Sequence, residues 1–93
     1  MSNAVSDNPE RSRYELAIAG DIAFIAYQRL GALRVLMHAE VPPLLRRRGV
    51  AAQLTAGALE LVRAQGGSVE ARCAYVAQFF ARNPQFQDLL AKS

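Results

Sequence analysis

The first half of the chain alternates apolar and polar residues with a period of two. Three runs show this alternation and are separated by glycine-containing turns: residues 14–18, 22–27 and 32–41. A period of two is that of a β-strand with one buried face. Short turns between consecutive runs favour antiparallel pairing of neighbours. The pattern therefore predicts a three-stranded antiparallel meander that ends at Pro42 and Pro43.

The third run assigns its side chains to the two faces of the sheet. One face carries Arg34, Leu36, His38 and Glu40. The other face carries Leu33, Val35, Met37, Ala39 and Val41. Because successive side chains of a regular strand point to opposite faces, the alternation predicts that Leu36 and His38 share a face.

After residue 49 the apolar period becomes that of a helix. The predicted apolar stripe consists of Val50, Leu54, Ala58, Leu61 and Val62. Further elements are expected as a strand over 68–72, a helix over 74–81 and a short last helix from Pro84. The order is βββ-α-β-α-α, and a right-handed strand–helix–strand connection makes the third and fourth strands parallel. The sequence thus predicts an α+β fold, a layered α/β sandwich whose mostly antiparallel sheet contains one parallel pair.

The composition is that of a soluble globular protein. Of 93 residues, 52% are hydrophobic and 20% are charged, which argues against disorder. We expect one domain over residues 13–92, preceded by a flexible polar leader over residues 1–12. Neither a membrane-spanning run nor an apolar signal core is visible. A single cysteine excludes an internal disulfide and is typical of a reducing compartment, so we expect a cytoplasmic protein.

The strongest candidate binding segment is Arg46-Arg47-Arg48-Gly49-Val50-Ala51, between a strand and a helix. A helix N-terminus presents unpaired N–H groups and positive dipole charge, and neighbouring arginines add donors for phosphate. The segment therefore predicts a pyrophosphate site. Its spacing matches neither a Walker A loop nor a dinucleotide fingerprint. The alternative is a solvated arginine loop.

Nucleic-acid binding is a further alternative, raised by the net charge of +3 and the isoelectric point near 9.6. The positive excess is local to the arginine run. Zinc-finger spacing and the aromatic pattern of ribonucleoprotein domains are both missing from the sequence. A small phosphate compound therefore fits the chain better than a nucleic acid.

Two other side chains are candidates for chemistry. Cys73 lies between a strand and a helix, where a thiol can become a nucleophile; the alternative is a small buried hydrophobe. His38 is the sole histidine and could act as a general base, or could fill a strand position with a satisfied hydrogen bond. These two residues form no metal-ligand cluster, so no metal site is expected.

The chain resembles the GNAT acetyltransferase superfamily, and more narrowly its small, single-domain YjdJ-like group. The resemblance spans residues 14–90 and rests on three segments: His38-Ala39-Glu40-Val41-Pro42, Leu45 to Ala51, and Cys73 to Phe86. Two residues depart from the pattern of this group. Ala39 replaces a threonine, and Asn83 stands where a histidine usually precedes Pro84.

The resemblance implies that acetyl-CoA is the bound phosphate compound. It implies a set of acetyl-CoA-binding residues: Val41, Arg46, Arg47, Arg48, Gly49, Val50, Ala51 and Asn83. The loop would cradle the pyrophosphate, the backbone around Val41 would pair with the pantetheine arm, and Cys73 would lie near the acetyl group. Tyr75 does not match the usual position of a proton-donating tyrosine, and Phe79, Phe80 and Phe86 are interpreted as core.

The implied function is acetyl transfer to an amine on a small molecule or a protein. The amine could attack the thioester directly with His38 as base, or Cys73 could first become acetylated. Both routes remain open at the level of sequence. The alternatives are a non-catalytic CoA-binding module and a basic nucleic-acid-binding domain.

Overall fold

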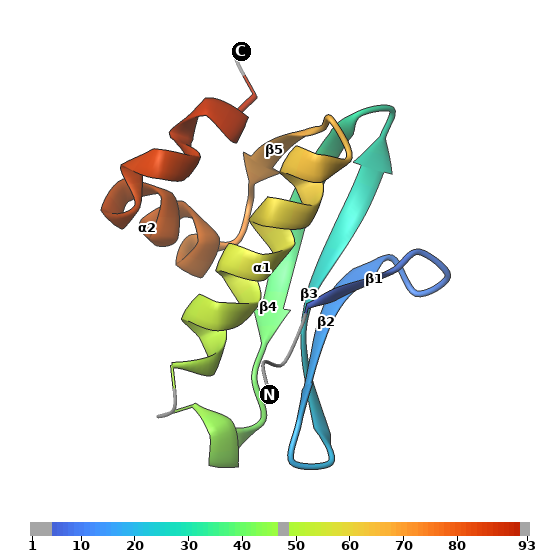
Figure 1. The fold of residues 1–93 in the computed structure, drawn as a ribbon, viewed down its shortest axis with the longest axis vertical. Helices are drawn as coiled ribbons and strands as arrows, with labels where there is room; N and C mark the ends of the chain where they lie inside the picture. The colour runs from blue at the N-terminus through green and yellow to red at the C-terminus, as the bar shows by residue number, and fades with distance from the viewer. Residues whose placement is uncertain (1–4, 47–48, 92–93) are drawn as a thin grey trace.

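The fold is a five-stranded sheet crossed on one face by a long helix (Figure 1). The computed structural model describes residues 5–46 and 49–91. In chain order, with η for 3₁₀ helices, the elements are β1 (Ser6–Asn8), β2 (Arg13–Ile18), β3 (Asp21–Leu30), β4 (Leu33–Glu40), η1 (Pro43–Leu45), α1 (Val50–Ala64), β5 (Ser68–Ala71), α2 (Ala74–Arg82) and η2 (Pro84–Leu89). The strands lie in chain order; β1 to β4 pair antiparallel, and β4 pairs parallel with β5. The predicted α+β class and its parallel pair are confirmed.

Helix α1 packs a broad apolar stripe against the sheet. Its buried residues are Val50, Leu54, Thr55, Ala58, Leu59 and Val62. Leu59 was not predicted to belong to this stripe, and Leu61, which was, is only half-buried. Helices that cover a sheet bury a stripe at least 100° wide, so the buried face extends beyond the narrow row predicted from sequence.

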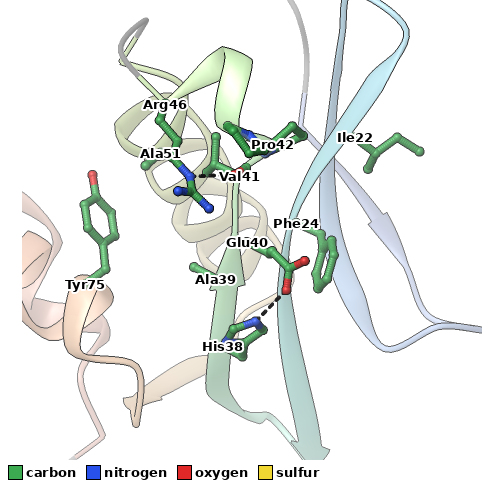
Figure 2. Close-up of a pocket in the computed structure, with 11 residues that line it drawn as sticks. Ile22, Phe24, His38, Ala39, Glu40, Val41, Pro42, Arg46, Ala51 and Tyr75 are labelled. Atoms are coloured by element: carbon green, nitrogen blue, oxygen red, sulfur yellow. Dashed lines mark hydrogen bonds and ion pairs between the residues drawn. The ribbon is translucent and has the colours of Figure 1, made fainter.

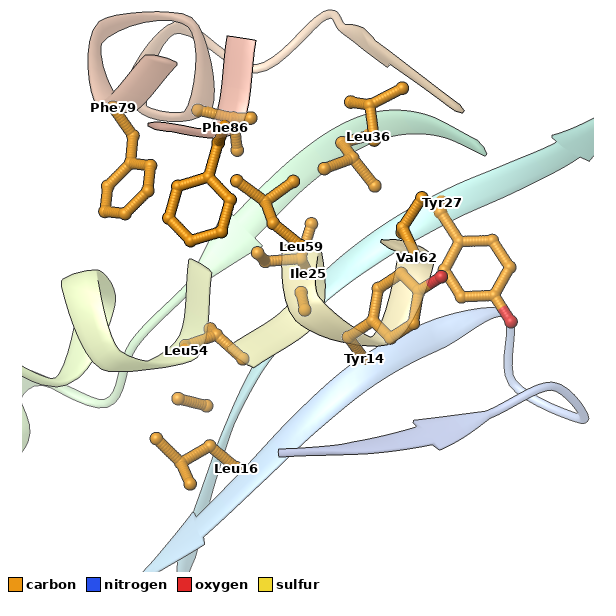
Figure 3. Close-up of a cluster of buried hydrophobic side chains, with 14 of the residues drawn as sticks. Tyr14, Leu16, Ile25, Tyr27, Leu36, Leu54, Leu59, Val62, Phe79 and Phe86 are labelled. Atoms are coloured by element: carbon orange, nitrogen blue, oxygen red, sulfur yellow. The ribbon is translucent and has the colours of Figure 1, made fainter. Parts of the chain in front are cut away.

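One hydrophobic core lies between α1, the sheet and the α2–η2 segment (Figure 3). From β2 and β3, Tyr14, Leu16 and Ile25 are fully buried. The segment α2–η2 contributes three buried phenylalanines: Phe79, Phe80 and Phe86. The interpretation of these three rings as core is therefore confirmed.

A β-bulge at Met37 changes the face on which the end of β4 presents its side chains. Leu36 pairs with Tyr27 across β3, whereas His38 pairs with Ala26, so Met37 is the extra residue. Leu36 is fully buried and His38 is exposed. The prediction that Leu36 and His38 share a face is therefore wrong, because strict alternation holds only in a strand without a bulge.

The sheet begins within the segment that was expected to be a flexible leader. Ser6–Asn8 forms the edge strand β1, which pairs with Arg13–Glu15 of β2. The sequence Ser-Asp-Asn has no apolar alternation that would predict a strand. Val5, just before β1, packs against the core and lies over Gly57 of α1. The contact between Val5 and Gly57 therefore holds the start of the sheet to the helix.

We expect Gly57→Ala to destabilise the protein by about 1 kcal/mol, although the same change in an open helix interior stabilises by about that amount. A Cβ at Gly57 would overlap the Val5 side chain and lie 2.7 Å from its Cβ. Urea unfolding measures the difference. In a Val5→Gly background, which removes the Val5 Cβ as well as its methyl groups, Gly57→Ala should instead become stabilising; stabilisation in the wild-type background would contradict the packing described.

A polar network joins β1 to the C-terminal end of α1. The Tyr27 hydroxyl donates to Asp7 at 2.6 Å, the Gln65 amide donates to the same carboxylate at 3.1 Å, and the Tyr14 hydroxyl donates to Gln65 at 3.3 Å. Burial, followed by the hydrogen bond to Asp7, raises the pKa of Tyr27 well above its ordinary 10.0. Burial also raises the pKa of Tyr14.

We expect the free energy of unfolding to fall as the pH rises above about 10, and Tyr27→Phe to reduce this fall. A tyrosine whose pKa is raised in the folded state keeps a proton that the unfolded chain loses. Its contribution is therefore complete below the ordinary pKa and is lost at higher pH. Urea unfolding at about pH 8 and about pH 11 measures the loss in both proteins. Equal losses would show that Tyr27 does not contribute.

Candidate functional site

A pocket of about 480 Å³ lies at the end of β4, where β5 stops pairing with it (Figure 2). The register between the two strands ends at Leu36 and Ala71. The backbone N–H groups of Arg72 and Cys73 then both donate to the Leu36 carbonyl, at 2.9 and 3.1 Å, and the chain turns into α2. The two strands therefore part beyond Leu36. Among the described residues, β5 does not pair with the edge of β4 that follows, so this edge can pair with an extended ligand as a strand pairs with its neighbour.

The pocket has two sides, separated by β4. On the side of α1 and α2 it is lined by Val41, Arg46, Ala51 and Tyr75. On the other face of the sheet it is lined by Ile22, Phe24, His38 and Glu40. Ala39, Pro42 and Pro43 complete the lining. Figure 2 shows Tyr75 across a gap from β4, with Phe24 and Glu40 beyond that strand.

The arginine–glycine segment borders the pocket on the α1 side. Arg46 ends η1, and its Nε–H donates to the Val41 carbonyl at 3.1 Å. Gly49 adopts a left-handed conformation with φ of 68°, which favours glycine, and α1 begins at the next residue. The predicted binding residues Arg47 and Arg48 lie outside the described residues. The first turn of α1 therefore brings its N–H groups beside Arg46 and the pocket.

The predicted residues Val50 and Ala51 differ in what their side chains contact. Val50 is 1% exposed and belongs to the core, so its backbone is what it can offer a ligand. Ala51 is half-buried and lines the pocket. Helix geometry explains the difference, because consecutive residues lie about 100° apart around the axis.

His38 contacts Glu40 on the sheet face turned away from α1. Its Nε2 lies 2.8 Å from Oε2 of Glu40, and both side chains are 60% exposed. Because an ionised carboxylate can only accept, Nε2 of neutral His38 carries the hydrogen. Nδ1 is then the nitrogen with a lone pair, which is the arrangement of a histidine that accepts a proton.

Cys73 precedes α2 at its N-cap position. Its side chain is half-buried and packs against the hydrophobic core, and it is not among the described residues that line the pocket. His38 hydrogen-bonds to Glu40 rather than to Cys73. The two residues predicted for catalysis therefore stand on either side of the point where β4 and β5 part.

Asn83 caps the end of α2. Its side-chain amide donates to the Phe79 carbonyl at 2.8 Å, and its own carbonyl accepts from the Phe86 N–H at 3.0 Å. In the described part of the chain it does not line the pocket. The role of Asn83 in acetyl-CoA binding stays a prediction.

The lining residues that were not selected from the sequence include Tyr75, Glu40 and Phe24. Tyr75 is 37% exposed in the first turn of α2, and burial raises the pKa of its hydroxyl while the nearby Arg82 lowers it. Glu40 follows His38 at the two-residue spacing of one strand face, a signal that sequence carries. Phe24 could be found only through the pairing of β3 with β4.

Two further features of the described residues concern membrane-spanning helices and metal sites. Over residues 5–46 and 49–91, no helix has the length and apolar character needed to cross a bilayer. The same ranges hold no group of three or more His, Cys, Asp or Glu side chains placed to share a metal ion.

Comparison with known proteins gives one family and one fold. Residues 13–89 match the family described as GCN5-related N-acetyl-transferase. The NMR solution structure of a GCN5-like protein from Staphylococcus aureus superimposes with a TM-score of 0.72 over 100% of this chain and 93% of that one. Its sequence is 18% identical, so the likeness concerns the fold. No curated protein sequence matches the chain.

Proposed function

The chain belongs to the GCN5-related N-acetyltransferases, and on that premise we propose that it moves the acetyl group of acetyl-CoA to an amine. The observation that carries the proposal is the pocket at the open edge of β4, with the start of α1 and Arg46 at one end. This arrangement offers a strand edge for an extended chain and an anion site beside it. Acetyl-CoA consists of both parts, a pantetheine arm and a pyrophosphate.

In this proposal the pyrophosphate lies at the first turn of α1. The N–H groups of Gly49, Val50 and Ala51 would donate to it, because the first N–H groups of a helix lack partners within the helix, and Arg46 would add charge-assisted donors. The Val41 carbonyl, which accepts from Arg46 in this structure, is the acceptor that a pantetheine amide would use. When acetyl-CoA binds, the Arg46 side chain would therefore move from the Val41 carbonyl to the phosphate.

The geometry favours direct transfer. The pocket reaches His38, whose Nδ1 can take a proton from an amine, whereas Cys73 packs against the core. The amine nitrogen attacks the thioester carbonyl, a C–N bond forms as the C–S bond breaks, and the thiolate takes up a proton. Holding both substrates in one pocket supplies the proximity that speeds such a step.

We expect Cys73→Ala to keep turnover within about threefold of the wild type, because no bond to the acetyl group forms at this residue in the direct route. Steady-state thioester consumption measures the effect. A fall to background, together with an acetyl adduct on Cys73 in the intact wild-type protein, would establish the acetyl-cysteine route instead.

The proposed function is tested by two measurements on the same protein. Calorimetric titration with CoA reports binding, and consumption of acetyl-CoA over a panel of primary amines reports transfer. We expect both. If CoA binds but acetyl-CoA is not consumed with any amine of the panel, the protein is a non-catalytic CoA-binding module. Absence of CoA binding would overturn the proposal.

A further inference from the structure

The pocket carries opposite charges at its two ends. Arg46 stands at the α1 side, and Glu40 stands on the face of the sheet turned away from α1 (Figure 2). Glu40 is the one acidic side chain among the described residues that line the pocket. An anionic substrate therefore fits the Arg46 end, and the Glu40 end attracts a cation.

Cross-strand pairing builds the Glu40 end. Phe24 of β3 pairs with Glu40, and Ala26, two residues later, pairs with His38. Residues directly opposite in antiparallel strands hold their Cβ atoms about 5 Å apart. The His38 ring stands edge-on to Phe24, with the ring centroids 6.4 Å apart. A carboxylate, a phenyl ring and an imidazole therefore form one compact group on an accessible sheet face.

Phe24 already holds one cation of the protein itself. The Cζ atom of Arg13 lies 4.4 Å from the Phe24 ring centroid, and Arg13 Nε–H donates to Glu15 at 2.5 Å. Glu15 pairs with Phe24 from β2, as Glu40 does from β4. A cation held by an aromatic ring and a carboxylate is a stable arrangement. On the β4 side, Glu40 supplies the carboxylate beside the same ring, and Phe24 and Glu40 both line the pocket.

We propose that the Glu40 end of the pocket is the acceptor subsite, and that it selects a primary amine in its ammonium form on an unbranched alkyl stem. The inference rests on the proposed function. Glu40 pairs with the ammonium, while Phe24 and the 45% exposed Ile22 contact the stem. A free alkylamine and a lysine side chain both carry this group.

The proton balance follows from the contact between His38 and Glu40. The bound ammonium gives one proton to Nδ1 of His38, while the Nε2–H group of His38 keeps its hydrogen bond to Glu40. The neutral amine then attacks the thioester carbonyl, a C–N bond replaces the C–S bond, and the second amine proton passes to the sulfur. The products are an N-alkylacetamide and CoA, and His38 returns its proton to water.

Charge-selective binding tests the subsite. The full chain, saturated with CoA, is titrated by NMR with n-butylammonium chloride and, separately, with O-propylhydroxylamine, an isostere that is uncharged at neutral pH. We expect tighter binding of butylammonium, with shift changes at Phe24 and Glu40. Because Glu40 is 60% exposed, Glu40→Gln should weaken this binding by only about fivefold and leave the neutral probe unaffected.

The matched control is Glu15→Gln, which lies on the same sheet face but outside the lining residues. It should leave the affinity for both probes unchanged. Equal affinities of the wild type for the two probes, or an equal loss in Glu15→Gln and Glu40→Gln, would overturn the subsite. If acetyl-CoA is consumed without such charge selectivity, acetyl transfer stands and the subsite fails.

The amide of Nα-acetyl-lysine distinguishes the two sources of the alkylammonium group. Binding of this probe and butylammonium with similar affinity supports a subsite for the alkylammonium group itself. A lysine amide that binds more tightly, and still loses affinity in Glu40→Gln, supports the same subsite with a polypeptide as its source. Binding of neither probe would overturn the inference.

Discussion

Replacing Ala51 with aspartate is expected to weaken acetyl-CoA binding by roughly a hundredfold while making the protein more stable. Ala51 lies in the first turn of α1 and lines the pocket. A carboxylate at a helix N-terminus stabilises by about 0.3–1 kcal/mol. The same carboxylate would stand where the pyrophosphate is proposed to bind, and like charges about 4 Å apart repel by roughly 4 kcal/mol near a protein surface. Screening leaves roughly a hundredfold loss of affinity.

Calorimetry with CoA and thermal unfolding measure the two opposite effects. Ala51→Asn has nearly the same size without the charge, so it separates crowding from repulsion and should cost much less affinity. Ala52→Asp places a carboxylate on the exposed neighbour, which should give similar stabilisation with a smaller loss of binding. Unchanged CoA affinity in Ala51→Asp would show that the pyrophosphate binds elsewhere.

His38→Gln is expected to lower kcat by about 10²- to 10⁴-fold without changing the affinity for CoA. The glutamine amide can still donate to Glu40, so the 2.8 Å contact made by His38 has a replacement. Glutamine has no lone-pair nitrogen that accepts a proton, so the variant loses the base alone. The exposed position of His38 keeps the cost to folding small.

The pH dependence of the rate of His38→Gln distinguishes the loss of a base from a purely structural role of His38. Without a base in the protein, the amine must lose its proton to solvent, so the rate with an alkylamine should rise by about tenfold per pH unit below the amine's pKa. A neutral alkoxyamine should be acetylated by both proteins at closer rates. A variant with wild-type kcat would remove His38 from the mechanism.

Local sequence patterns predicted the features that depend on neighbours along the chain. The apolar period fixed α1 and its start beside the arginines, and the strand–helix–strand order fixed the parallel pairing of β4 with β5. The position of Ala51 in the first helical turn was predictable for the same reason. Arg47 and Arg48 lie outside the described residues, so their part in the site stays a prediction.

Features that depend on pairing between distant residues were not predictable. The bulge at Met37 exists only relative to β3, so the sequence of β4 gave the wrong face for His38. Strand β1 has a polar sequence and is held by β2 and by the contact of Val5 with Gly57. The proximity of Phe24 and Glu40 likewise depends on the register between β3 and β4, which the apolar period within one strand does not determine.

The bulge at Met37 also affects how such sites can arise and disappear during evolution. An extra residue twists and bends its strand, and it lies next to Leu36, where β5 stops following β4. Deletion of the Met37 codon would keep every candidate residue in the gene and on its present face of the sheet. It would nevertheless straighten β4 and favour continued pairing of β4 with β5, which would close the gap between these two strands. Among related genes, strand length at this point is therefore as informative as residue identity, and a survey of motifs alone would not detect the change.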